Sequence, residues 1–479
     1  MQKKFLTNLA LLLVVNLLVK PFWIFGIDRT VQNTVGADDY GFYATLFNFS
    51  FLFNILLDLG INNFNNRNIA QHQHLVSKHF SRLIVTRLGL GLLYGGVTLL
   101  AGWALGYGAN YLQLLLWLAF NQFLAYTILY LRSNLSGLHL FRTDSLLSVL
   151  DRSLMILICG ALLWGDFTGQ RFQIEWFVYA QSGSYLLTLC IAFVALYPRL
   201  EDFRPRFAWR FSLTVLRQSI PYALLILLMT FYYKVDAVMI ERLLPDGARQ
   251  VGIYYQGFRL LDAAHMIAVL FAGLLLPILS RMLKQGEAVE EMLGLSVRLL
   301  AVPAFVLAVA CWLFQEEIMA LLYQEQTAAS APILGMLMAA FVPIAFTYVF
   351  GTLLTANGSL RQLNWMGVGG VVLNIGLNWV MIPSLEAYGA AVASCITQLL
   401  TALAQMWIAR QLFGFTIPVK FVLHLLGFAL SVLLLAWGID QWASAWSLRF
   451  WTFIGGAILL AIFTRTVDPK SLFRILRRQ

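Results

Sequence analysis

The sequence predicts an all-α polytopic membrane protein with about fourteen transmembrane helices. Of its 479 residues, 60% are hydrophobic and 12% are charged, whereas soluble domains are about half apolar and about a quarter charged. A spanning helix needs about 20 predominantly apolar residues, and such runs recur from Phe5 to Thr464 with only short polar breaks. Windows of about 19 residues place the spans at 5–27, 40–63, 83–106, 110–131, 145–164, 175–197, 213–240, 252–279, 294–315, 331–355, 363–383, 388–409, 420–438 and 448–465.

The distribution of charged residues supports these spans and predicts the topology. Cations occupy both termini and the even-numbered connections: Lys3, Lys4, Arg67, Lys78, Arg82, Arg132, Arg142, Arg199, Arg204, Arg206, Arg210, Arg281, Lys284, Arg361, Arg410, Lys470, Arg474, Arg477 and Arg478. Acids prevail in the odd-numbered connections: Asp38, Asp39, Asp166, Glu241, Asp246, Glu316, Glu317, Glu325, Glu386 and Asp440. Because cytoplasmic loops carry the excess of Lys and Arg, we expect a multi-pass protein of the cell inner membrane with both termini cytoplasmic. The net charge of +10 therefore reflects topology, not a nucleic-acid partner.

Short connections favour a transporter over an enzyme. No connection exceeds roughly 20 residues, so no extramembrane domain is available for a soluble catalytic site. The four cysteines, Cys159, Cys190, Cys311 and Cys395, fall within predicted spans and lack CxxC spacing. We therefore expect neither disulfides, nor a metal site, nor a cofactor.

A faint internal repeat suggests two related halves. Thr34-Val35-Gly36 leading to Tyr40-Gly41-Phe42-Tyr43 is echoed by Gln250-Val251-Gly252-Ile253-Tyr254-Tyr255, six predicted helices later. An even offset gives both copies the same orientation in the membrane, as in parallel transporter repeats. We expect a six-helix bundle over residues 1–210, a second over 211–415, and helices 13 and 14 with a basic cytoplasmic tail over 416–479.

Several motifs resemble those of polysaccharide flippases, a family of the multidrug/oligosaccharidyl-lipid/polysaccharide exporter superfamily. They are Gly36…Tyr40-Gly41…Tyr43 with Asp58-Leu59-Gly60; Lys234-Val235-Asp236 leading to Val251-Gly252-Ile253-Tyr254; Ala356-Asn357-Gly358 with Arg361-Gln362; and Asn374-Ile375-Gly376-Leu377-Asn378, Ile382-Pro383 and Tyr388-Gly389-Ala390-Ala391-Val392-Ala393-Ser394. Together with the fourteen spans, they extend the resemblance over essentially the whole chain.

The resemblance implies a fold and a cargo. The fold is a V-shaped pair of six-helix bundles that works by alternating access, with a cationic central cavity lined by helices 1, 2, 7 and 8. The cargo is an undecaprenyl-diphosphate-linked oligosaccharide used for surface polysaccharide such as lipopolysaccharide O-antigen. A sister group moves lipid II, but this sequence lacks the arginine-rich first helix of that group.

Cations within the spans are the candidate substrate-binding residues. At 1.5 Å per residue, Lys20, Lys234 and Arg259 lie roughly 10 Å below the predicted outer interface. Three cations at one depth can bind a diphosphate, since Arg and Lys both bind phosphate oxygens. The alternative is that each side chain snorkels to the headgroups independently. Arg29, at the mouth of helix 1, is a fourth candidate for substrate contact or interfacial anchoring.

Acidic residues in the spans are candidates for coupling to H⁺ or Na⁺: Asp58, Asp236 and Asp262. Charges inside a bilayer are costly and usually face a wet cavity or a partner. Asp236 can instead neutralise Lys234, and Asp262 can pair with Arg259 at i,i+3. Pro21, directly after Lys20, removes a backbone hydrogen bond and predicts a kink in helix 1.

Two rival functions are left open. A drug or metabolite extruder of the same superfamily would favour an acidic cavity for organic cations, whereas a diphosphate carrier needs positive charge. A membrane glycosyltransferase or polymerase is disfavoured by the short outer loops. Such enzymes are instead candidate partners of the predicted flippase.

Overall fold

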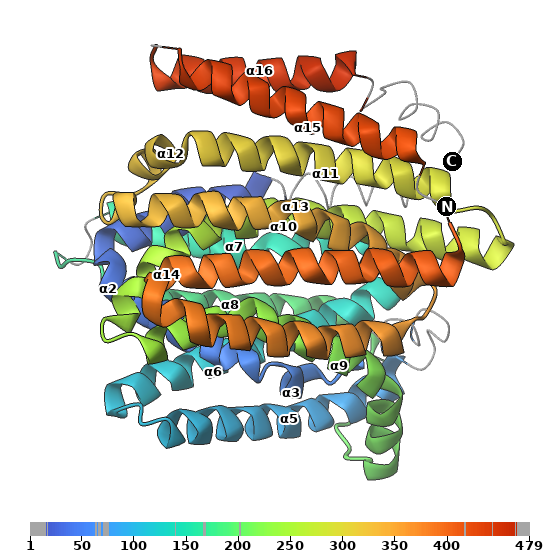
Figure 1. Cartoon of the computed structure of the whole chain (residues 1–479). Helices are drawn as coiled ribbons and strands as arrows, with labels where there is room; N and C mark the ends of the chain where they lie inside the picture. Colours follow the sequence, from blue (N-terminus) through green and yellow to red (C-terminus); the bar gives the residue numbers. More distant parts are fainter. Residues whose placement is uncertain are drawn as a thin grey trace. The chain divides into compact units, whose positions relative to one another are not determined.

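The computed structural model is mainly helical in the part that it describes, which comprises residues 16, 18–62, 65, 69, 76–138, 140–165, 169–200, 203–415, 418–442, 444–464 and 466. Within this part, ten helices are long and apolar enough to cross a membrane, and no strand occurs. The predicted all-α membrane fold is therefore confirmed (Figure 1). Residues 5–15 of the predicted first span, Arg67, Asp166 and the basic tail from 467 lie outside the described residues.

The chain forms two compact units, the first being Met1–Gly252. Its elements are the π-helix η1 (Trp23–Asp28), α2 (Arg29–Leu52), α3 (Ile55–Asp58), α5 (Val76–Ala104), α6 (Ala109–Gly137), α7 (Phe141–Trp164), α8 (Ile174–Leu196), the 3₁₀-helix η3 (Tyr197–Arg199), α9 (Trp209–Leu243) and the start of α10 (Gly247–Gln285). Helix α6 packs against α8 and α2, and α9 packs along α2.

The second unit is Ile253–Gln479. It contains the rest of α10, α11 (Glu290–Leu313), α12 (Gln315–Leu322), α13 (Thr327–Ala356), α14 (Leu360–Phe413), α15 (Val419–Asp440) and α16 (Trp446–Phe463). Helix α13 packs against α11 and α14, while α15 and α16 pack together and against α11. The non-helical Glu386 (φ 54°, ψ −139°) divides α14, so this one helix accounts for the predicted spans 363–383 and 388–409.

Three breaks divide the chain between η1 and α5. The π-turns of η1 begin two residues after Pro21, close to the predicted kink. Gly36 (φ 83°, ψ 173°) interrupts α2, a conformation that side-chain-bearing residues rarely adopt. Leu59 (φ 45°) and Gly60 (φ 81°) then follow α3. Of these breaks, Gly36 lies between the predicted spans 5–27 and 40–63, and the Leu59–Gly60 turn lies near the end of the second span.

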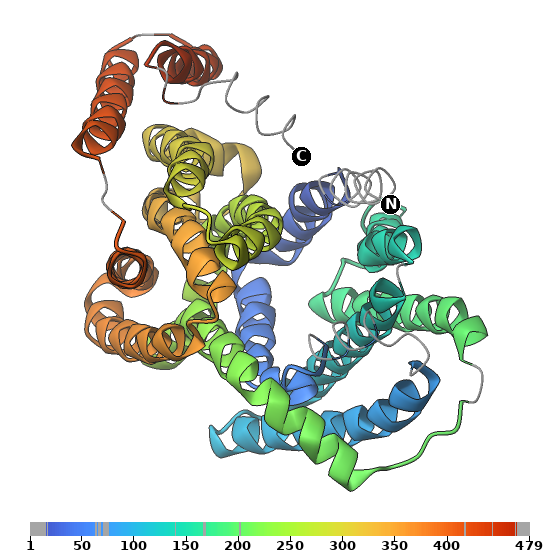
Figure 2. The ribbon, with the colours of Figure 1, turned by 90° about the vertical axis from the view of Figure 1, so that its right-hand side faces the viewer.

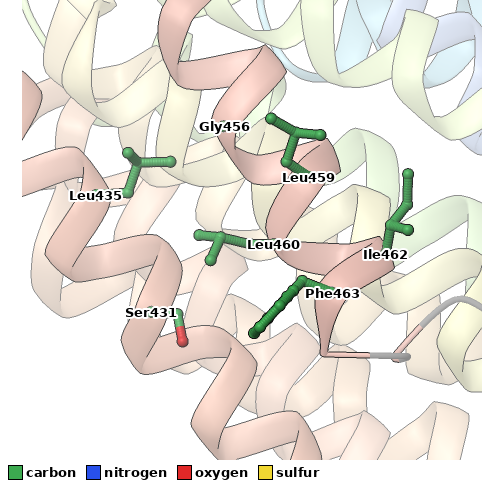
Figure 3. Close-up of a pocket in the computed structure, with 7 residues that line it drawn as sticks. All are labelled: Ser431, Leu435, Gly456, Leu459, Leu460, Ile462 and Phe463. Atoms are coloured by element: carbon green, nitrogen blue, oxygen red, sulfur yellow. The ribbon is translucent and has the colours of Figure 1, made fainter.

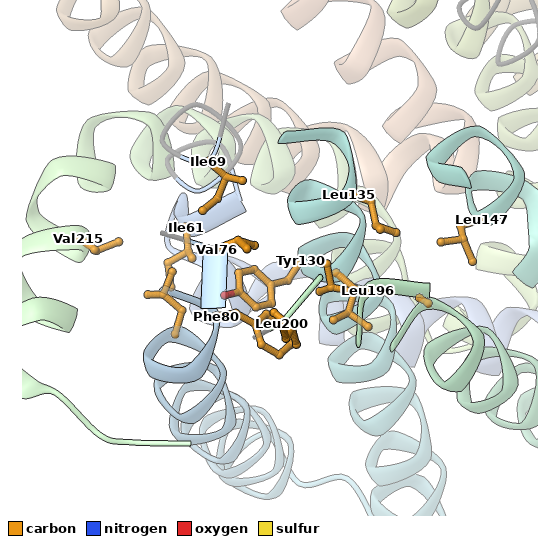
Figure 4. Packing of buried hydrophobic residues seen from close by; sticks show 13 residues of the cluster. Ile61, Ile69, Val76, Phe80, Tyr130, Leu135, Leu147, Leu196, Leu200 and Val215 are labelled. Carbon is orange, nitrogen blue, oxygen red and sulfur yellow. The ribbon is translucent and has the colours of Figure 1, made fainter. Parts of the chain in front are cut away.

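One end of the first unit has a dense apolar core (Figure 4). It is formed by Ile61, Ile69, Val76, Phe80, Leu83, Tyr130, Leu131, Leu135, Leu147, Ala192, Leu196, Leu200 and Val215. The Phe80 and Tyr130 rings stack with centroids 5.6 Å apart. This core joins α5, α6 and α8 to the start of α9, at the end of the helices where the sequence places the basic connections.

The predicted topology can be tested by cysteine labelling. We expect a single cysteine introduced at Arg206 to be protected from an impermeant thiol reagent in intact cells, because the positive-inside rule places this loop in the cytoplasm. A cysteine at Glu325 should be labelled, and permeabilised cells should label both. Strong labelling at Arg206 in intact cells would contradict the fourteen-span topology.

Candidate functional site

Charged residues on α6 and α7 act electrostatically on Lys20. Its side chain is half-buried, and the charges that act on it belong to Arg152, Asp151 and Arg132. The Arg152 guanidinium lies 5.2 Å from the centre of the Trp23 ring, and its Nε lies 3.7 Å from Asp151 Oδ2. Arg132 pairs more closely with Asp144, at 2.7 Å.

We call this group the cationic cluster. It consists of Lys20, Arg132, Arg152, Asp144 and Asp151, and its three cations outnumber its two carboxylates. Both ion pairs retain some exposure, and Lys20 is half-buried. Nearby contacts attach η1 and the residue Asn16 to α7 and α8: Asn16 Nδ2 donates to Ser148 Oγ at 3.0 Å, and the Trp23 ring stacks on Phe177 with centroids 5.7 Å apart.

The sequence prediction included Lys20 but not Arg132 or Arg152. Arg152 and Asp151 lie inside the predicted span 145–164, and charges at such a position mark functional sites by default. That signal was available in the sequence. Arg132 was counted only as a topological charge, and its proximity to Lys20 depends on how α6 and the first helix pack.

Arg29 lies one residue after the buried carboxylate of Asp28, which is not among the site residues predicted from the sequence. Asp28 is 2% exposed, and the Tyr40 hydroxyl donates to its two oxygens at 3.1 and 2.9 Å. The Arg29 side chain is half-buried, and its Nε has no hydrogen-bond partner. A role of Arg29 in substrate contact stays a prediction.

Lys234 and Asp236 both lie on α9. The Lys234 ammonium lies 5.9 Å from the centre of the Phe51 ring on α2, whereas Asp236 is buried, with 2% exposure. Both side chains have further interactions in the structure. Because α9 packs along α2 in this unit, Lys234 is held against the second helix.

Asp58 is held in a buried ion pair. Arg87 Nη1 lies 2.9 Å from Asp58 Oδ1, and the two side chains are 2% and 10% exposed. Arg87 also donates to the Tyr126 carbonyl at 2.7 Å and lies 4.8 Å from the Tyr130 ring centre. Arg87 thus neutralises Asp58 and fixes the chain beyond the Leu59–Gly60 turn. A coupling role for Asp58 stays a prediction.

Arg259 and Asp262 lie in the second unit. Arg259 Nη1 and Asp262 Oδ2 are 3.7 Å apart, so the i,i+3 pair that the sequence allowed is present. Arg259 also lies 5.3 Å from the Tyr255 ring centre. Farther along α10, His265 Nε2 forms a 2.5 Å hydrogen bond with the Tyr348 hydroxyl of α13. The shared depth of Arg259 with Lys20 and Lys234 stays a prediction.

An apolar cavity of 610 Å³ lies between α15 and α16 (Figure 3). It is lined by Ser431, Leu435, Gly456, Leu459, Leu460, Ile462 and Phe463. None of these side chains carries a charge, so the cavity offers a diphosphate no cationic partner. No group of three or more His, Cys, Asp or Glu side chains that could hold a metal occurs within the described ranges.

Family models identify the relatives of this chain. The model described as polysaccharide biosynthesis protein matches residues 5–283, more than half of the chain. The chain belongs to this family. The model described as lipid II flippase MurJ matches residues 155–458. The protein is therefore a member of the flippase families of the multidrug/oligosaccharidyl-lipid/polysaccharide exporter superfamily, as the motifs predicted.

Solved structures share the fold of this flippase-family protein. A lipid II flippase MurJ in an inward closed conformation has a TM-score of 0.70 at 12% identity, over 96% of this chain and 100% of the other. An inward-facing multidrug resistance MATE family transporter has a TM-score of 0.66 at 15% identity, over 82% and 94%. A transporter of the superfamily from Pyrococcus furiosus has a TM-score of 0.57 at 14% identity, over 85% and 94%. No curated protein matches the chain.

Proposed function

We propose that the protein is a flippase that carries an undecaprenyl-diphosphate-linked oligosaccharide across the inner membrane for surface polysaccharide biosynthesis. The observation that supports this proposal best is the cationic cluster. A diphosphate is an anion with several acceptor oxygens, and Arg and Lys are the side chains that bind it through charge-assisted hydrogen bonds. The transport cycle proposed is alternating access, as in related membrane transporters.

The same cluster argues against an extruder of organic cations. Lys20, Arg132 and Arg152 outnumber Asp144 and Asp151, and a cationic cargo would be repelled at this location. Lipid II remains the main alternative cargo, since it carries the same diphosphate and the lipid II flippase model matches residues 155–458. The two cargoes differ in their headgroups and not in the chemistry that the cluster recognises.

Transport energy is proposed to come from H⁺ or Na⁺, with Asp236 and Asp262 as the first coupling candidates. Asp236 is buried at 2% exposure, and Asp262 pairs with Arg259 on a helix that also carries His265. Asp58 is a weaker candidate because Arg87 already compensates its charge. Neighbouring glycosyltransferases and a polymerase are the proposed partners in the pathway.

Neutralising the proposed diphosphate ligands is expected to abolish surface polysaccharide. Lys20→Gln, Arg152→Gln and Arg259→Gln should each remove a charge-assisted hydrogen bond worth about 1.5–3 kcal/mol, which lowers substrate occupancy about ten- to a hundredfold. The measurement is surface glycan in cells that lack the native gene and express each variant, with membrane abundance checked in parallel. Arg249→Gln is the matched control, since Arg249 is exposed and lies outside the proposed site.

Two further variants separate the alternatives. Lys20→Arg keeps an interfacial anchor but changes phosphate geometry, so it should preserve export only if Lys20 snorkels. Rescue of cells depleted of their lipid II flippase by the wild-type protein would identify lipid II as the cargo. Full surface glycan from both Lys20→Gln and Arg259→Gln at normal abundance would show that the cargo is recognised without these cations.

A further inference from the structure

The segment from Phe203 to Arg210, called the basic strap, follows η3 and runs into α9. Residues 203–208 are non-helical, and Trp209 and Arg210 form the start of α9. Figure 2 shows it as the green trace that leads into α9. Two backbone hydrogen bonds attach it to the start of α5. Arg206 N–H donates to the Ser81 carbonyl at 3.0 Å, and Arg204 N–H donates to Ser81 Oγ at 3.2 Å.

One side chain of the strap points into the protein. The Phe203 ring lies 5.5 Å from Phe80 and 5.9 Å from Phe193, measured between centroids, and it packs against the apolar core of the first unit. Together with the bonds to Ser81, this anchor gives the strap a fixed conformation. The backbone that carries the following side chains, from Arg204 to Arg210, is therefore held in place.

The remaining large side chains are basic or aromatic and are exposed. Arg204, Arg206 and Arg210 are exposed, and Phe207 and Trp209 are 61% and 65% exposed. The strap contains no acidic residue. Arg210 also lies in the first turn of α9, where the helix dipole disfavours a cation. Helix stability therefore does not explain this charge.

The position of the strap indicates what covers it. It follows α8 and η3, whose residues Ile174–Arg199 form a candidate membrane span, so the strap lies where a membrane surface begins. Basic residues directly beside a span bind anionic lipid headgroups, and aromatic rings of Trp and Tyr type settle at the same level. Interleaved Arg and aromatic side chains match this interface better than they match an acidic protein surface.

We propose that the basic strap is a binding site for anionic phospholipid headgroups, with Arg204, Arg206 and Arg210 contacting phosphates and with Phe207 and Trp209 inserted at the interface. Each basic residue near an anionic surface contributes about a fivefold attraction. The site lies outside the cationic cluster and does not depend on the proposed cargo. Lipid binding at this site would attach the N-terminal end of α9 to the membrane surface.

The test compares lipid binding by the purified full-length protein in detergent. The probes are dioleoylphosphatidylglycerol and dioleoylphosphatidylcholine, with bound lipid quantified by native mass spectrometry. We expect the double variant Arg204→Gln/Arg206→Gln to bind phosphatidylglycerol at least about tenfold more weakly, with phosphatidylcholine binding unchanged. Glutamine keeps the backbone donors to Ser81, so the fold should be retained.

A matched double variant, Arg171→Gln/Arg249→Gln, removes two exposed cations elsewhere and should bind phosphatidylglycerol like the wild type. Raising the salt concentration should remove the preference of the wild type for phosphatidylglycerol but not change the strap variant. Equal phosphatidylglycerol binding by the wild type and the strap variant would overturn the proposal and leave an acidic protein as the partner of the strap. Equal losses for both lipids would also overturn it.

Discussion

Replacement of Gly41 by alanine is expected to destabilise the protein by more than about 3 kcal/mol, at the upper end of overpacking effects. A Cβ atom at Gly41 would lie 1.7 Å from the Ala248 carbonyl oxygen. One at Gly252 would lie 2.1 Å from the Ala37 carbonyl oxygen. Since these neighbours are backbone atoms, no change of side-chain rotamer can relieve the clash. Thermal unfolding of the purified variant measures the effect.

The matched control is Gly95→Ala on α5, where an added Cβ atom meets nothing within 4 Å. Because alanine favours a helix interior by about 0.5–1 kcal/mol over glycine, this variant should unfold at the wild-type temperature or slightly above. Gly252→Ala should behave like Gly41→Ala. If Gly41→Ala unfolds together with Gly95→Ala, the close packing of α2 on the first turns of α10 is wrong.

This contact involves residues from both copies of the predicted internal repeat. Each glycine faces the carbonyl four residues before the other, Gly41 opposite Ala248 and Gly252 opposite Ala37. Gln32 Nε2 adds a hydrogen bond to the Gly252 carbonyl at 3.1 Å. Tyr40-Gly41 and Val251-Gly252 are therefore in contact within the first unit, and Gly41 and Gly252 must be glycine because the two backbones touch.

Arg87→Ala is expected to cost about 3–5 kcal/mol, because it leaves Asp58 charged and uncompensated in a buried site. The Arg87 side chain is 2% exposed, so water cannot replace it. The variant also removes the hydrogen bond to the Tyr126 carbonyl. Thermal unfolding again measures the loss, and a double variant Arg87→Leu/Asp58→Leu should recover much of it, since both buried charges are then absent.

Arg242→Ala is the control for this prediction. Arg242 pairs with Glu241 at 3.0 Å, but its side chain is 34% exposed. Burial raises the pKa of Glu241 and Arg242 opposes this rise. Exposed pairs contribute little, and with the loss of the Tyr107 ring contact the cost should stay below about 2 kcal/mol. Equal unfolding temperatures for Arg87→Ala and Arg242→Ala would contradict a structural role of the buried pair.

The same pair bears on the coupling hypothesis. If Asp58 couples transport to an ion, Asp58→Asn should abolish export while the protein keeps its unfolding temperature. If the pair is structural, Asp58→Asn should lower both together. The structure favours the second outcome, because Asp58 also accepts the Asn62 N–H at 3.2 Å beside the strained Leu59 backbone.

The sequence by itself determined the fold class, the positions of most helices and the family. These properties depend on apolar run length and on short motifs, which are local to the chain. The spans at 110–131 and 331–355, for example, fall within α6 (Ala109–Gly137) and α13 (Thr327–Ala356). The sequence also identified Lys20 as a candidate site residue, which stays a prediction.

Only the tertiary structure decided which charges meet. Arg132 and Arg152 act electrostatically on Lys20, Arg87 pairs with Asp58 across 29 residues, and Gly41 touches the first turn of α10. Depth in the membrane follows from a rise of 1.5 Å per residue. Contact between helices depends on their rotation and crossing angle, which result from the packing of many side chains at once and are not encoded in any single segment.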